Sequence, residues 1–122
     1  MSRMSKASAP WSGKNVLVVG GTQGIGRATA IAFAKTGASV TVTGRHVGRG
    51  EALLKDLKAA APSATMSFEA FDVTSMRTVA SFTERFRKTN AASGLHSLVL
   101  CAGGLNYGPR RETAEGCYFK TV

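Results

Sequence analysis

Four short runs of apolar or β-branched residues alternate with stretches of helical periodicity, and this alternation restricts the fold more than any other feature. The runs are 16–19 (VLVV), 39–43 (SVTVT), 65–73 and 98–100 (LVL). The order is therefore β-α-β-α-β-α-β, and strands separated by helices pair in parallel through right-handed crossovers. We predict an α/β fold with a doubly wound parallel sheet, of which this chain holds the first four strands.

The three intervening stretches each carry an apolar stripe at helical spacing. The first stripe, which ends at Gly37, is Ile25, Ala28, Thr29, Ala32 and Phe33. The second follows Gly48 and Gly50, ends before Pro62, and is Leu53, Leu54, Leu57 and Ala61. For the third we expect Thr74 as the N-cap and an inner face of Met76, Val79, Ala80, Thr83 and Phe86. Thr113 is expected to begin one more helix.

Length and composition limit the class of protein. A chain of 122 residues forms one domain at most, and 43% hydrophobic with 19% charged residues is typical of a globular protein. No apolar stretch is long enough to cross a bilayer, so we expect no membrane partner. Cys101 and Cys117 follow neither a metal-ligand spacing nor a disulfide framework, which is typical of a reducing compartment. We therefore expect a cytoplasmic protein without a metal.

The first residues, MSRMSKASAPWSGK, are basic, rich in Ser and free of acidic side chains. Transit peptides and frayed chain termini share this composition, and the segment lacks an apolar core of signal-peptide length. We interpret residues 1–12 as a flexible basic tail, and organellar targeting stays open as the alternative.

The formal net charge is +9, from 16 Lys and Arg against 7 Asp and Glu. Such an excess favours anionic partners, among them nucleotides, nucleic acid and anionic lipid. The basic residues are scattered, and aromatic residues do not alternate with them as base-stacking platforms would. We therefore expect no nucleic-acid partner. The opposite hypothesis predicts an oligonucleotide affinity that falls steeply with salt.

The segment VVGGTQGIGRA (18–28) places a glycine-rich loop between a predicted strand and a predicted helix. That context distinguishes a dinucleotide-binding loop from a simple tight turn, which is the alternative interpretation. Glycines at 20, 24 and 26 let the backbone approach a pyrophosphate, and the helix N-terminus offers unpaired N–H groups. We predict a phosphate cradle that also includes Thr22, Gln23 and Ile25, within a Rossmann-like dinucleotide-binding domain over 13–122.

The end of the second predicted strand distinguishes NADP from NAD. A carboxylate there would bind the ribose hydroxyls of NAD, but no Asp or Glu occurs between Ser39 and Gly50. Arg45 stands at this point, and a guanidinium can pair with the 2′-phosphate of NADP. We predict NADP rather than NAD, with the Thr22 hydroxyl as an additional donor and His46 as a neighbour. The alternative is that Arg45 is a solvated loop cation.

Three ordered motifs give the sequence from about Gly13 onward a resemblance to the short-chain dehydrogenases/reductases. Val19–Gly26 matches the pattern T-G-x-x-x-G-x-G except at Val19, where the family has Thr. Asp72-Val73 resembles the pair that borders the adenine ring in that family. Cys101-Ala102-Gly103 resembles the family's N-A-G segment, with Cys101 in place of the Asn that braces the sheet. The resemblance thus implies that Asp72, Val73 and 101–103 belong to the cofactor site.

The resemblance also implies a catalytic Ser and a Tyr-x-x-x-Lys pair, in which the ammonium group favours the phenolate. Neither tyrosine fits, because Tyr107 is followed four residues later by Arg111 and Tyr118 by Val122. We expect no catalytic residue in this chain, and expect all three beyond Val122. The chain would then be the N-terminal, cofactor-binding half of an NADP(H)-dependent oxidoreductase acting on a small carbonyl or alcohol, with homo-oligomerisation open. If 122 residues is the natural length, the alternative is a non-catalytic dinucleotide-binding module.

Overall fold

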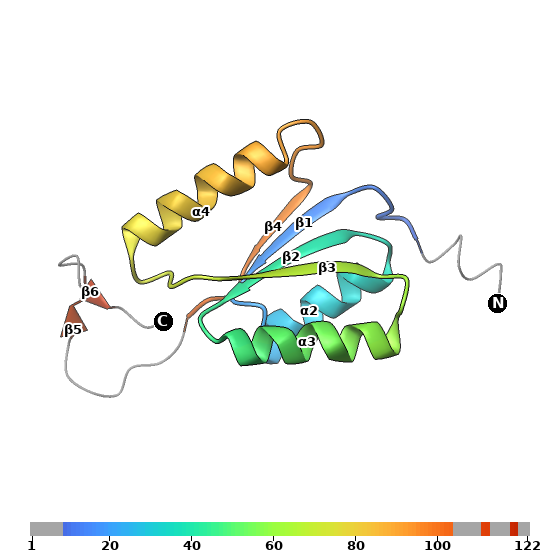
Figure 1. The fold of residues 1–122 in the computed structure, drawn as a ribbon, viewed down its shortest axis with the longest axis horizontal. Helices are drawn as coiled ribbons and strands as arrows, with labels where there is room; N and C mark the ends of the chain where they lie inside the picture. The colour runs from blue at the N-terminus through green and yellow to red at the C-terminus, as the bar shows by residue number, and fades with distance from the viewer. Residues whose placement is uncertain (1–8, 104–110, 113–117, 120–122) are drawn as a thin grey trace.

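The structure, a computed structural model, describes residues 9–103, 111–112 and 118–119. Its centre is a four-stranded parallel sheet in the order β3-β2-β1-β4. The strands are β1 (Asn15–Val19), β2 (Ser39–Gly44), β3 (Thr65–Ala70) and β4 (Ser97–Leu100). The helices α2 (Gly24–Lys35) and α3 (Val47–Ala60) lie on one face, and α4 (Met76–Thr89) lies on the other (Figure 1). The predicted α/β class and parallel sheet are confirmed.

The hydrophobic core lies on the face of the sheet that α2 and α3 cover. Its strand residues are valines at alternate positions: Val16, Val18, Val40 and Val42. The helices add Ala30 and Ala34 from α2 and Leu53 and Leu57 from α3. On the opposite face, β2 and β3 place Thr41 beside Ser67, with their hydroxyl oxygens 3.4 Å apart. Where β2 and β3 pair, the sheet is therefore apolar on one side and hydroxyl-bearing on the other. In β1 and β4 this second side carries Leu17, Leu98 and Leu100, because alternate residues of a strand share one face.

Helix α2 is rotated relative to the predicted stripe. Its buried residues are Gly26, Ala30 and Ala34, whereas Ile25 is 81% exposed. Residues four apart share one helix face, and three small side chains on that face allow the helix axis to approach the sheet closely. The apolar stripe at helical spacing is therefore not the buried face of α2.

Helix α4 also differs from the prediction. The N-cap is Ser75, whose hydroxyl accepts a hydrogen bond from the N–H of Thr78, and not Thr74. The buried residue of the helix is Phe82, whose ring stacks on Phe71 with centroids 4.6 Å apart. Met76, which was expected on the inner face, is 67% exposed, and Ala80 and Thr83 are exposed as well. The third strand ends at Ala70 rather than Val73, because residues 71–75 form the connection into α4.

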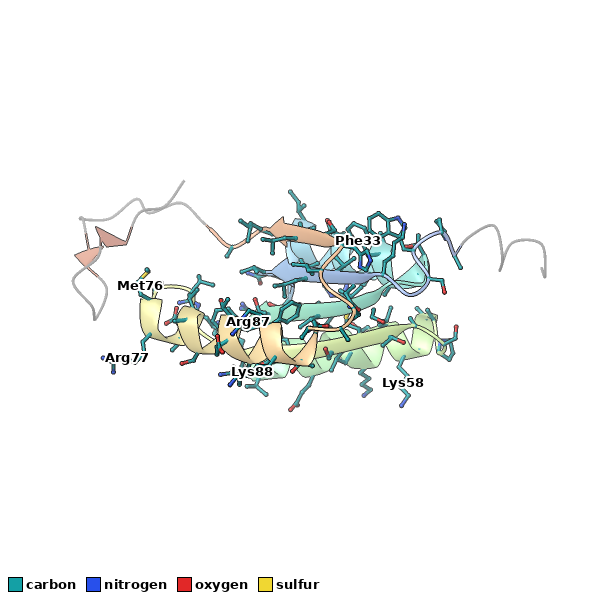
Figure 2. All side chains as sticks on the ribbon, turned by 90° about the horizontal axis from the view of Figure 1, so that it is seen from above. Phe33, Lys58, Met76, Arg77, Arg87 and Lys88 are labelled. Carbon is teal, nitrogen blue, oxygen red and sulfur yellow. The ribbon has the colours of Figure 1, made fainter. Side chains whose placement is uncertain are left out.

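The chain before β1 contacts the end of α2. The ring of Trp11 packs edge-on against Phe33, with centroids 5.0 Å apart, and the backbone N–H of Trp11 donates to the carbonyl oxygen of Thr36. Phe33 is labelled in Figure 2. The predicted tail boundary at residue 12 stays a prediction, although Trp11 itself belongs to the packed structure.

Two short strands follow β4 in the chain. They are β5 (Arg111–Glu112) and β6 (Tyr118–Phe119), which pair antiparallel. A helix was expected to begin at Thr113, but Tyr118–Phe119, a few residues further on, form a strand. Thr113 itself lies outside the described residues.

Candidate dinucleotide-binding site

The site is built where the parallel strands end, because all four carboxyl ends meet at one edge of the sheet (Figure 1). The loop after β1 is joined to β2 by the N–H groups of Gly20 and Gly21, which donate to the carbonyl oxygen of Thr43 at 3.0 and 3.1 Å. The segment after β4 is joined to β1 by the N–H of Cys101, which donates to the carbonyl oxygen of Val19 at 2.8 Å. The predicted glycine loop therefore lies between the ends of its two neighbouring strands.

Gly20 occupies a position where only glycine fits. Its φ is +83°, and a methyl group added there would lie 2.6 Å from the backbone nitrogen of Ala102. That atom belongs to the main chain after β4 and cannot rotate away. The loop is thus closed on one side by Ala102, one of the three residues that the resemblance assigned to the cofactor site.

Gly24 and Gly26 serve the loop in different ways. A methyl group added at Gly26 would collide with the carbonyl oxygen of Gly20, so this glycine lets α2 begin directly against the loop. Gly24 has a φ of +60° and no atom within 4 Å of an added methyl group. A backbone cradle with open space at its centre is the arrangement that a phosphate group requires.

Two helices, α2 and α3, begin at this edge without a side-chain N-cap. The N-cap residues of α2 and α3, Gln23 and His46, make no side-chain capping bond, and neither helix has an acidic residue in its first turn. Helix α4 differs, because Ser75 caps it. Free N–H groups and the positive end of the helix dipole attract anions. The site therefore offers two positions for negative charge, one at each helix.

Arg45 directly follows β2 and comes two residues before α3 begins, and its side chain is exposed. Beside it, Thr22 packs over Gly44: its methyl carbon and its hydroxyl oxygen lie 2.8 and 3.1 Å from where a Cβ of Gly44 would stand. Gly44 was not among the predicted site residues. A glycine at the end of a β-branched strand was the available signal, since it indicates a close approach.

Asp72 follows β3 and is held in one orientation by Thr74. One carboxylate oxygen, Oδ1, accepts bonds from the N–H of Thr74 at 2.9 Å and from its hydroxyl at 2.7 Å. These two bonds, the backbone one first, lower the pKa of Asp72 below its usual value of 3.8. Burial opposes them in part, and the charge of Arg45 adds a smaller lowering effect. Asp72 is therefore a carboxylate whose Oδ2 makes no hydrogen bond that the described residues show.

The remaining predicted residues follow the ends of β3 and β4 in the sequence. Val73 is 41% exposed, and Cys101 is half-buried with a free thiol. Gly103 ends the continuously described part of the chain, so Tyr107 lies outside it. Within the described residues, no group of acidic, His or Cys side chains could hold a metal, and no helix is long and apolar enough to cross a membrane.

Comparison with known proteins assigns the family. The model of the family described as short chain dehydrogenase matches residues 14–122. This chain belongs to the short-chain dehydrogenase family. Among curated members, it is 35% identical over 107 residues to the polyprenol dehydrogenase of Mus musculus, covering 88% of this chain and 31% of that protein. It is also 35% identical over 92 residues to a 3-ketodihydrosphingosine reductase of Cryptococcus neoformans, covering 75% of this chain and 28% of that one.

Solved structures of short-chain dehydrogenases share the fold. A citronellol catabolism dehydrogenase of Pseudomonas aeruginosa superimposes with a TM-score of 0.70 at 26% identity, covering 81% of this chain and 40% of that one. The chain spans about a third of the length of the curated relatives it matches, for example 31% of the polyprenol dehydrogenase. The predicted resemblance to the family is confirmed.

Proposed function

We propose that this chain supplies the cofactor-binding part of an NADP(H)-dependent oxidoreductase that interconverts a carbonyl and an alcohol. The observation that carries the proposal is the loop of Gly20, Gly24 and Gly26, which has backbone atoms close to Gly20 and Gly26 and open space beside Gly24. A bound nicotinamide dinucleotide would supply the hydride chemistry, and the protein would supply binding and orientation.

The pyrophosphate would be held at the N-terminus of α2. The first helical bond there is donated by Arg27 to the carbonyl oxygen of Gln23, which leaves the earlier N–H groups of the helix without a helical partner. Ile25 projects from this same turn and is 81% exposed. A large apolar side chain next to unpaired N–H groups fits a ligand that has both phosphates and flat rings.

The end of β2 supports NADP over NAD. Arg45 and Arg49 are both exposed near the uncapped start of α3, and no carboxylate occurs between Ser39 and Gly50. A positive cluster at a helix N-terminus is unfavourable by itself, because the dipole already places positive charge there. A 2′-phosphate would relieve this repulsion, whereas a ribose hydroxyl would not. Thr22, held over Gly44, adds a hydroxyl donor.

Asp72 is suited to the amino group of an adenine. Thr74 occupies Oδ1 with two hydrogen bonds, which leaves Oδ2 as an acceptor directed by a fixed carboxylate. The lowered pKa keeps the group ionised, so it accepts and does not donate. Val73, exposed beside it, offers an apolar contact for the ring.

The test of cofactor preference is Arg45→Asp against Lys58→Asp, an equal charge change in the last turn of α3. Binding of NADPH and NADH is measured by titration calorimetry. We expect Arg45→Asp to weaken NADPH at least about 10-fold and NADH by less than about 2-fold, because a charge-assisted bond is lost. Lys58→Asp should change neither. Equal weakening of both dinucleotides would reject the role of Arg45, and a wild-type chain that binds neither would reject the proposal itself.

The proposal places the catalytic Ser, Tyr and Lys beyond Val122, and the alternative is a dinucleotide-binding module without turnover. The intact mass of the native polypeptide distinguishes them. A longer polypeptide whose extra sequence contains a Ser and Tyr-x-x-x-Lys supports the enzyme. A mass of 12.7 kDa would support the module.

A further inference from the structure

The outer face of α4 is strongly cationic. In its 14 residues the helix carries Arg77, Arg85, Arg87 and Lys88 against one carboxylate, Glu84. All four cations are exposed. Figure 2 shows the labelled Arg77, Arg87 and Lys88 spread along the helix, with Met76 at its first turn. None of these side chains belongs to the proposed dinucleotide site.

Two carboxylates pair with Arg85, Arg87 and Lys88 but leave their side chains largely in solvent. Glu84 is shared between Arg87, at 2.9 Å, and Lys88, at 3.8 Å, and the side chains of these two cations are 71% and 74% exposed. Arg85 pairs with Glu69 of β3 at 2.9 Å, again with more than half of its side chain in solvent. Exposed ion pairs of this kind are weak, so the cations can exchange these partners for another anion.

The face also contains a hollow. Small side chains at Ala80 and Ser81 leave a shallow depression of about 470 Å³, whose remaining walls are Glu84, Arg85 and Lys88. Next to the cations, Met76 presents a flexible thioether side chain that is 67% exposed. Clustered cations with an exposed apolar side chain at one end are the features of a protein surface that binds an anionic membrane.

We propose that the outer face of α4 docks on a membrane surface that contains anionic phospholipids. Charge complementarity and the exposed Met76 favour a membrane over nucleic acid, since no aromatic side chain occurs among the large apolar residues that the structure describes as exposed. This inference departs from our expectation of no membrane partner, which rested on the absence of a membrane-spanning stretch and does not bear on surface docking. Because α4 begins just after Asp72, a membrane on this face lies next to the proposed cofactor site.

The experiment is co-sedimentation of the chain with phosphatidylcholine vesicles containing about 30% phosphatidylserine, compared with pure phosphatidylcholine vesicles. The test variant is Arg77→Gln/Arg87→Gln/Lys88→Gln. The control is Lys35→Gln/Lys55→Gln/Lys58→Gln, which removes the same charge from α2 and α3 on the opposite face of the sheet (Figure 1). Circular dichroism establishes that each variant is folded. The single variants Arg87→Gln and Lys88→Gln replace the triple variant if it is not.

We expect the wild type to bind only the anionic vesicles. Each cation removed from α4 should weaken binding about 5-fold, so that the triple variant binds about 100-fold more weakly and the control less than about 3-fold. A wild type that does not bind the anionic vesicles, equal binding to pure phosphatidylcholine vesicles, or an equal loss in test and control variants would each overturn the proposal. The measurement needs no dinucleotide, so its failure leaves the proposed function unaffected.

Discussion

The three glycines of the cradle allow backbone strain to be separated from steric contact. Gly24 has a left-handed φ and open space, Gly26 has a close contact, and Gly20 has both. Replacing each glycine in turn by alanine adds the same methyl group in three different surroundings. The resulting losses of stability and of NADPH affinity should therefore follow different orders.

For Gly24→Ala we expect a loss of unfolding free energy of about 1 kcal/mol or less. A left-handed alanine costs about 1–2 kcal/mol, and the lower entropy of the unfolded chain returns about 0.4–1 kcal/mol. NADPH affinity should nevertheless fall at least about 10-fold, because the methyl group enters the open space where the phosphates are proposed to lie.

The other two substitutions should damage the fold. In Gly26→Ala, the new methyl group and the carbonyl oxygen of Gly20 must separate by about 1 Å, and overpacking of this kind costs about 1–3 kcal/mol. Gly20→Ala adds left-handed strain to a contact with the Ala102 main chain, for a total of about 3–4 kcal/mol. Both should lose NADPH binding together with stability.

Urea unfolding followed by the fluorescence of Trp11, the single tryptophan, gives the stabilities, and NADPH fluorescence gives the affinities. Wild-type affinity in Gly24→Ala would refute the phosphate position. If Gly20→Ala is milder than Gly24→Ala, the close approach of the segment after β4 is refuted.

Two further changes test single polar groups. Within the described residues, the buried hydroxyl of Thr43 has no hydrogen-bond partner. Thr43→Val should therefore raise the unfolding free energy by about 1 kcal/mol in urea titrations, and a loss would show that the hydroxyl has a partner. Asp72 has a lowered pKa in the folded state, so its contribution is present above the unfolded pKa and disappears as pH falls through the folded value. Asp72→Asn should therefore be less stable than wild type near neutral pH and equally stable in acid, and a difference that persists in acid would contradict this.

The order of strands and helices could be predicted because each element has a strong local signal. The runs that form β1 and β2 consist mostly of valine and threonine, which favour strands. The glycines at 20, 24 and 26 occur at the junction between the first predicted strand and the first predicted helix. Arg45 could be placed at the end of the second strand before the structure was known, because it follows the β-branched run directly. Asp72 was assigned to the site only by the family resemblance.

The orientation of α2 and α4 could not be predicted, because both depend on tertiary contacts. Gly26 faces inward in place of Ile25, since only glycine permits the contact with the loop. Phe82 is buried in place of Met76, because Phe71 offers it a ring to stack on from outside the helix. A hydrophobic pattern shows which residues are apolar, but not which of them packs against another element of the fold.

The contact between Gly20 and Ala102 makes the cradle a non-local structure. Its floor comes from the first loop of the chain and its wall from the segment after the fourth strand. During synthesis, the glycine loop leaves the ribosome long before its wall exists, so a nascent chain carries the motif without the complete binding surface. Conversely, a dinucleotide that binds the finished cradle holds the first and fourth strands together. A supply of the cofactor would then raise the fraction of chains that are folded, because it binds only chains whose sheet is complete.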